Sequence, residues 1–185
     1  DWSIRAPDQF WAAMWKFAAV VAEVHPDGAP WSQVVHGVDR MAPPDAIHGP
    51  HWFPGARLNF AENLLRFRGA EAAIIARDER GMRRELSRDA LRTDVARVAA
   101  AFRAMGVVAG DRVAGFLPNI PEAVIAMLAA ASIGAVWSSC SPDFGTRGVL
   151  DRLVQLEILD LERLARLAGE ADGAVPVHGV VTPNA

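Results

Sequence analysis

Hydrophobic residues recur with helical spacing in the first part of the chain. Behind Pro7, apolar side chains return every three or four positions, which predicts an amphipathic helix over residues 7–24. The repeating positions are Phe10, Trp11, Met14, Trp15, Ala18 and Val21. One face of this helix is therefore expected to pack against another part of the protein.

Residues 25–55 break that pattern, because glycine and proline recur too often for long helices or strands. We expect this proline-rich segment to run over the surface of a larger body. Its large aromatic residues, Trp31, Trp52 and Phe53, would pin it there. A short helix over 59–67 is predicted to follow.

The middle of the chain changes from strand-like to helical periodicity. Residues 72–76 and 82–86 read as two short strands around a turn at 78–81. Ser87 is placed to cap the next helix, and Gly106 is placed to end it. The apolar stripe of that helix is predicted to be Leu91, Val95, Val98, Phe102 and Met105.

A strand, a helix and a second strand follow, over residues 112–117, 121–133 and 135–138. This order predicts a crossover unit in a parallel sheet, so the fold class is α/β. Small residues and a proline follow the second strand and predict a loop that ends at Gly145. Loops after the strand ends of such sheets usually carry function.

Helical spacing then continues without a break over residues 146–169. Its apolar positions are Leu150, Val154, Ile158, Leu161, Ala165 and Ala168. A strand is predicted over 175–181, with no later segment to pair with it. We therefore expect an incomplete fold, in which the 146–169 stripe could support self-association.

Charge argues against nucleic acid and acidic membranes as partners, since the 185 residues carry a net charge of −3. The basic cluster is interleaved with acidic residues and is expected to be a solvated face; its arginines are Arg83, Arg84, Arg88 and Arg92.

The aromatic residues at 11, 15, 31, 52 and 53 are expected to anchor a core rather than to stack on bases. The uncharged run 123–142 is expected to be a buried helix and strand, not a membrane span, because Gly134 interrupts it.

Residue counts exclude several kinds of catalytic site. Cys140 is the single cysteine, so no internal disulfide forms and a cytoplasmic setting is favoured. No histidine has a fixed relation to it, and we expect a buried structural thiol. The spacing of His48 and His51 resembles a metal pair, but nothing completes the set and no metal is expected. Lys16 is the only lysine, which excludes a phosphate-binding G-x-x-x-x-G-K loop and a second lysine base.

The loop over residues 137–145 is the remaining candidate for function. It contains no G-x-S-x-G elbow, and G-x-G-x-x-G is absent, which disfavours a dinucleotide-binding fold. Backbone N–H groups at the start of the helix after Gly145 could bind an anion such as a phosphate. An ordinary connecting loop explains the same residues equally well.

Three stretches resemble the acyl-CoA synthetase branch of the adenylate-forming, AMP-binding superfamily, and within it the ligases that activate acetoacetate. The first is the tryptophan-rich start, with Trp2, Trp11 and Trp15. The second is HWFPGARLNFAENLL at residues 51–65, and the third is 110–151, with GDRV and SSCSPDFG. The resemblance covers about residues 1–157.

The resemblance implies a two-step ligase. ATP and a short carboxylic acid such as acetoacetate would give an acyl-adenylate, and coenzyme A would then release AMP and form a thioester. Mg²⁺ would assist the first step. No nucleic acid and no membrane partner are implied.

The resemblance also implies a division of the chain. Residues 1–68 would be an N-terminal extension, 69–157 the start of the large α/β domain of an adenylate-forming enzyme, and 158–185 a divergent tail. By alignment on their Ser-Pro, Ser138, Ser139 and Cys140 would lie near the coenzyme A channel. No catalytic or metal-binding residue is carried over.

The sequence departs from the family after Glu157, where the expected Pro-Lys strand and basic glycine-rich segment are missing. The phosphate loop, the residues that hold adenine and ribose, and the catalytic lysine are absent as well. We therefore expect a truncated portion of a ligase that is inactive alone. The alternative is a non-catalytic module that binds a partner chain or an acyl-CoA.

Overall fold

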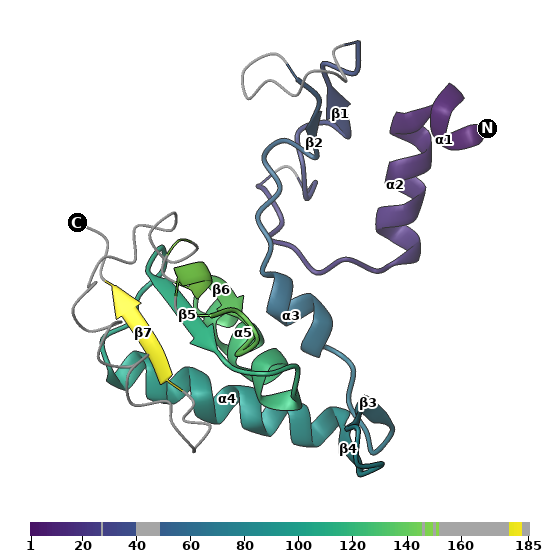
Figure 1. The fold of residues 1–185 in the computed structure, drawn as a ribbon. Helices are drawn as coiled ribbons and strands as arrows, with labels where there is room; N and C mark the ends of the chain where they lie inside the picture. The colour runs from purple at the N-terminus through teal and green to yellow at the C-terminus, as the bar shows by residue number, and fades with distance from the viewer. Residues whose placement is uncertain (27, 40–48, 146, 150, 152–177, 183–185) are drawn as a thin grey trace. The chain divides into compact units, whose positions relative to one another are not determined.

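The fold was derived from a computed structural model, which describes residues 1–26, 28–39, 49–145, 147–149, 151 and 178–182 (Figure 1). The chain divides into two compact units, Asp1–Asn63 and Leu64–Ala185. Within the described ranges, none of the helices has the length and apolar character needed to cross a membrane. The functional boundaries expected at residues 68 and 157 stay predictions.

The first unit opens with two helices, α1 (Trp2–Arg5) and α2 (Pro7–Phe17). The predicted helix is correct in its start, but its predicted end at residue 24 is wrong. Ala19 adopts a left-handed conformation with φ of 46°, and its amide donates to the Lys16 carbonyl. The next amide, of Val20, reaches back to the Trp15 carbonyl at 3.2 Å. These two bonds form a Schellman motif, which ends the helix.

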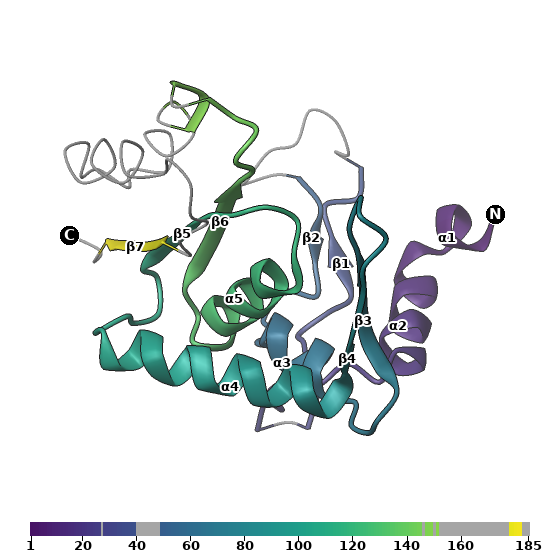
Figure 2. The same cartoon turned by 60° about the horizontal axis from the view of Figure 1, so that its bottom comes forward.

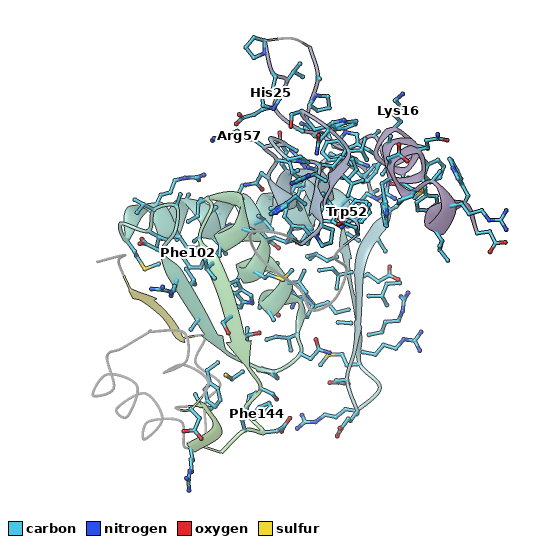
Figure 3. The ribbon with its side chains drawn as sticks, turned by 90° about the horizontal axis from the view of Figure 1, so that it is seen from above. Lys16, His25, Trp52, Arg57, Phe102 and Phe144 are labelled. Carbon is cyan, nitrogen blue, oxygen red and sulfur yellow. The ribbon has the colours of Figure 1, made fainter. Side chains whose placement is uncertain are left out.

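Aromatic rings hold the proline-rich segment of the first unit against α2. Trp15 lies 4.6 Å from Trp31 and 4.6 Å from Phe53, between ring centroids, and the latter two rings are 5.0 Å apart. A second contact joins Trp11 to Trp52 at 5.7 Å, and Figure 3 shows Trp52 among these crowded side chains. The predicted pinning role of the aromatic residues is confirmed. Such ring pairs contribute roughly 0.5–1.5 kcal/mol beyond their burial.

The same segment contains the antiparallel pair β1 (Val35–His36) and β2 (His51–Trp52). Helix α3 (Phe60–Leu65) follows, shorter than predicted. The Asn63 side chain accepts from the Val21 amide and donates to its carbonyl, each at 2.8 Å. This two-way bond fixes the chain after α2 against the start of α3.

The second unit begins with a hairpin of β3 (Ala72–Arg77) and β4 (Arg83–Ser87), as predicted. The Asp78 carboxylate accepts from the Met82 amide at 2.8 Å across the turn. Gly81, with φ of +82°, takes the turn conformation that other residues adopt at a cost. The turn residues therefore explain why the two strands reverse here.

Helix α4 (Arg88–Ala104) starts where the sequence predicts, because the Ser87 hydroxyl accepts from the Ala90 amide at 3.1 Å. Its buried residues are Leu91, Val95, Ala99 and Phe102. The predicted burial of Met105 is wrong, since its side chain is 63% exposed. Met105 is the C-cap, and Gly106 with φ of +87° turns the chain away before that side chain can reach the core.

The predicted crossover unit is confirmed. Strand β5 (Arg112–Phe116) runs parallel to β6 (Val136–Cys140), with α5 (Pro121–Ser132) between them in sequence. Figure 2 shows α5 lying between these strands and α4. The core of the unit is centred on this layer and includes Val113 and Leu128, which are 1% and 2% exposed. Each such side chain contributes roughly 1.5–3 kcal/mol by leaving water.

A third strand, β7 (His178–Thr182), lies on the other side of β5 and runs antiparallel to it, which gives the order β6-β5-β7. A strand near 175–181 was predicted correctly, and its observed partner, β5, precedes it in the chain. It pairs with a strand more than 60 residues earlier, a contact that local sequence cannot reveal. The predicted helix over 146–169, with its proposed role in self-association, lies outside the described residues except for 147–149 and 151.

Two arginines of the basic cluster, which was predicted to be a solvated face, form ion pairs in the second unit. Arg83 contacts Glu85, and Arg84 forms a hydrogen-bonded ion pair with Glu122 at the start of α5. Burial alone raises the pKa of Glu122, but the hydrogen bond from Arg84, a backbone hydrogen bond and the Arg84 charge hold that pKa below its usual range. The pair therefore ties the hairpin to α5 through an ionised carboxylate.

Glu122→Gln is expected to remove a pH-dependent part of the stability. Because the folded pKa of Glu122 is depressed, its contribution is present above the unfolded pKa and disappears as pH falls through the folded pKa. The wild type should therefore be more stable than the variant at neutral pH, with a difference that shrinks in acid. Urea unfolding from about pH 7 to about pH 3 measures this difference. Glu79→Gln, at the exposed hairpin turn, is the control, and a difference independent of pH would contradict the assignment.

Candidate functional site

The carboxyl ends of β5 and β6 form the edge of the sheet where ligands of α/β proteins usually bind. The two strands end in register, at Phe116 and Cys140. The Leu117 amide continues the ladder by donating to the Cys140 carbonyl at 3.2 Å. In Figure 3, Phe144 lies beyond the arrowheads of these strands, whereas Phe102 lies towards their opposite end. Polar residues at this edge come from the end of β6 and from the loop after it.

The three residues predicted at the site lie within β6 and not in a loop after it. The predicted strand end at residue 138 is therefore corrected to Cys140. Side chains alternate across a strand, so Ser138 and Cys140 share one face, while Ser139 lies on the other. Cys140 is buried, as predicted, at 3% exposure, whereas Ser139 is exposed. The strand consequently separates the three side chains instead of gathering them.

Gly115 is a residue near this edge that sequence reasoning missed, and it contacts Trp137, the first residue of the predicted 137–145 loop. A Cβ atom at Gly115 would lie 2.5 Å from Trp137 Cη2 and 2.5 Å from Leu117 Cδ2. The indole of Trp137 therefore rests on the bare backbone of β5, on the face that also carries Ser139. A glycine in the middle of a buried strand was the available signal, because such glycines often mark a close approach.

The loop after β6 is shaped by its own side chains. The Ser141 hydroxyl donates to the Asp143 carboxylate at 2.8 Å, and the Asp143 amide returns a weaker bond to that hydroxyl at 3.4 Å. The Phe144 amide donates to the Ser141 carbonyl at 3.1 Å. This is a compact turn of the kind that serine and aspartate favour. It leaves the Asp143 side chain exposed at the carboxyl edge.

The anion site expected after Gly145 stays a prediction. The chain there does become helical, and the Val149 amide donates to the Gly145 carbonyl at 3.2 Å. Residue 146, which would supply one of the amides, is outside the described range. The turn and the short helical stretch fit an ordinary connection and an anion site equally.

The GDRV motif lies at the amino end of β5, opposite the candidate site. Asp111 is 2% exposed, and its carboxylate accepts from the Val108 amide at 2.8 Å. Its own backbone joins the turn to β6, through the Val136 amide at 2.7 Å. Asp111 therefore stabilises the turn that leads into the sheet. The motif-rich stretch 110–145 thus begins with a residue that stabilises the fold and ends at the candidate site.

The described side chains do not assemble a catalytic set at this edge. Ser141 bonds to a carboxylate, but the histidines whose side chains the structure describes, His25, His36 and His51, belong to the first unit. The backbone of His178 pairs with Phe116 in β7. In the ranges that the structure covers, no three histidine, cysteine, aspartate or glutamate side chains group as metal ligands. This edge presents an exposed hydroxyl at Ser139, on the face where the Trp137 indole contacts Gly115.

Comparison with known proteins identifies the family. A family model described as "AMP-binding enzyme" matches residues 60–158, which include β3 to β6 and the whole carboxyl edge. The chain belongs to the AMP-binding enzyme family. The α/β fold class inferred from sequence is confirmed by the same region, because a solved family relative has the same arrangement.

Several of the similar proteins have the same activity name. The acetoacetyl-coenzyme A synthetase of Rhizobium meliloti is 46% identical over 156 residues, and that of Rattus norvegicus is 48% identical over 158. A solved acetoacetyl-CoA synthetase from Streptomyces lividans superposes with a TM-score of 0.72 at 43% identity and covers 84% of this chain. The resemblance to acetoacetate-activating ligases is thereby confirmed.

The match covers most of this chain and a small part of the relatives. The matched region includes 84% of this chain. It includes only 22% of the length of the Rhizobium and rat proteins and 23% of the Streptomyces structure. The AMP-binding family member therefore corresponds to about a fifth of each relative.

Proposed function

We propose that these residues are part of an acid–thiol ligase that makes acetoacetyl-CoA from acetoacetate, ATP and coenzyme A through an acyl-adenylate. The observation that supports this is the 46–48% identity to proteins called acetoacetyl-CoA synthetases, held over 84% of the chain. Mg²⁺ would neutralise phosphate charge in the adenylation step of the complete enzyme. None of the described side chains is assigned to ATP or to the metal ion.

Within this proposal, Ser139 is the residue that lines the coenzyme A channel. It is exposed, lies at the carboxyl end of β6, and shares its face with Trp137. Cys140 fits contact with coenzyme A poorly, because its side chain is 3% exposed on the other face. Ser138 and Cys140 would instead position the strand, while Trp137 resting on Gly115 keeps the Ser139 side of the sheet flat.

The 185 residues alone are proposed to be inactive as a ligase. The support is that the matched relatives are several times longer, and that Lys16 is the only lysine here. The purified chain, supplied with acetoacetate, ATP, Mg²⁺ and coenzyme A, should release no acetoacetate-dependent AMP. AMP release above the background without acetoacetate would contradict this.

A chimaera tests the ligase proposal itself. Residues 1–157 would replace the matched segment of the Streptomyces lividans enzyme, and the product should release AMP in response to acetoacetate. In that chimaera, Ser139→Leu should raise the KM for coenzyme A and leave the KM for acetoacetate unchanged. Ser132→Ala, at the end of α5, is the matched control. An inactive but folded chimaera would overturn the function, and equal KM changes for both substrates would overturn the role of Ser139.

A further inference from the structure

An apolar cavity of about 360 Å³ lies within the second unit, away from the carboxyl edge. It is formed by the end of α3, the segment leading into β3, β3 itself, α4 and α5, and contains no residue of β5 or β6. Its lining residues are Leu64, Leu65, Phe67, Ala72, Ala73, Ile74, Arg88, Leu91, Val124 and Leu128. Two of its lining residues are core side chains, since Leu91 is 8% and Leu128 2% exposed.

Arg88 is the one charged residue among the lining residues of this cavity, and the others are apolar. Arg88 is the first residue of α4, and its side chain is 40% exposed. Its guanidinium approaches the Glu71 carboxylate at 3.5 Å, but that glutamate is 68% exposed, so the pair contributes little stability. The same guanidinium lies 5.7 Å from the centroid of the Phe67 ring, and that of Arg66 lies 4.6 Å from it. Two guanidinium groups therefore lie against the Phe67 ring that lines the cavity, with the Glu71 carboxylate beside one of them.

The first three amides of α4 are already bonded within the protein. Those of Arg88 and Asp89 donate to the carbonyls of Glu71 and Gly69, and that of Ala90 donates to the Ser87 hydroxyl. An anionic group at the mouth would therefore meet the Arg88 guanidinium and not the helix end, while apolar atoms would be favoured within the cavity. The cavity volume is at the lower end of the range for small-molecule sites, which suits a slender ligand.

We propose that this cavity binds an unbranched aliphatic monocarboxylate, with its carboxylate on Arg88 and its alkyl chain between α4, α5 and β3. The apolar lining disfavours nucleotides and sugars, whose polar groups would lose water without gaining partners. One guanidinium matches one carboxylate, in a geometry that forms paired hydrogen bonds. The site is independent of the proposed ligase function, since it shares no residue with the carboxyl edge.

Titration of the 185-residue chain with octanoate, followed by calorimetry and by amide NMR shifts, tests the proposal. Octanoate should bind at one saturable site and shift amides of β3 and α4. Octanol, which lacks the charge, and butanoate, which lacks the chain, should each bind at least tenfold more weakly. Arg88→Gln should weaken octanoate binding about tenfold and leave octanol binding unchanged.

Two further variants separate binding from folding. Ala73→Trp, at an exposed position of β3 that lines the cavity, should abolish octanoate binding by filling the space. Arg103→Gln, at the exposed far end of α4, is the matched control and should bind octanoate as the wild type does. Circular dichroism confirms that each variant is folded. Absence of saturable binding, equal affinity for octanol and octanoate, or a full effect of Arg103→Gln would each overturn the proposal.

Discussion

Gly115→Ala is expected to lower the free energy of unfolding by about 2 kcal/mol. The added methyl group would lie 2.5 Å from the Trp137 ring and 2.5 Å from the Leu117 side chain. Neither neighbour is free to retreat without cost, because Leu117 is 4% exposed and Trp137 is held in a strand that pairs with β5 along its length. Urea unfolding followed by far-ultraviolet circular dichroism measures the loss.

Gly145→Ala is the matched control for this substitution. No heavy atom lies within 4 Å of a Cβ built on Gly145, so its replacement should change stability by less than about 0.5 kcal/mol. Combining Gly115→Ala with Trp137→Leu should cost less than the sum of the two single changes, because the smaller side chain relieves part of the clash. A Gly115→Ala variant as stable as the wild type would show that the indole does not rest on this backbone.

Asp111→Ala is expected to destabilise the protein by about 2–3 kcal/mol. The substitution leaves the Val108 amide without its 2.8 Å acceptor in a turn where Asp111 is 2% exposed, and it opens a small cavity. This hydrogen bond is partly buried, so the Val108 amide regains only part of its hydration when the carboxylate is removed. The turn also leads directly into β5, so loosening it should affect the whole sheet. Thermal and urea unfolding give the change.

Asp111→Asn separates the hydrogen bond from the charge at this turn. The amide oxygen can still accept from Val108, so most of the stability should remain. Glu79→Ala, in the exposed turn of the β3–β4 hairpin, serves as the surface control and should be nearly neutral. If Asp111→Ala is no worse than Glu79→Ala, the aspartate does not hold the entry to the sheet.

Both predictions concern residues beside the motifs that revealed the family. The GDRV turn at residues 110–113 and the SSCSPDFG segment at residues 138–145 belong to one crossover unit, yet they occupy opposite ends of the β5–β6 pair. The amino end is closed by buried hydrogen bonds around Asp111, and the carboxyl end presents Ser139 and a turn made by Ser141 and Asp143. The buried hydrogen bonds and the proposed binding residues thus lie at different ends of the same two strands.

Local patterns predicted most elements because they depend on nearby residues. The Ser87 cap, the β3–β4 turn and the helical spacing of Leu91, Val95 and Phe102 are all readable within a few positions. Errors arose where geometry changes at an end, as at Ala19 and Met105. Alanine rarely adopts a left-handed conformation, so the residue type at position 19 did not indicate that the helix ends there.

The candidate site was only partly readable in the same way. Family motifs pointed to Ser138, Ser139 and Cys140, but the sequence could not say that the strand continues through them. Strand length depends on the partner, and here β5 pairs with β6 as far as Cys140. The alternation of a strand then divides the three residues between two faces.

The sequence by itself determined the α/β class, the crossover unit and the family. These follow from the periodicity of hydrophobic residues, from the glycine and proline residues that end helices and strands, and from short motifs of adjacent residues. The tertiary structure decided which side chains share a face, that the Trp137 ring covers Gly115, and that β7 pairs with β5. It also brought Arg88 to an apolar cavity lined by residues as far apart as 64 and 128. Those contacts join positions distant in the chain, and their energies depend on packing that no local pattern encodes.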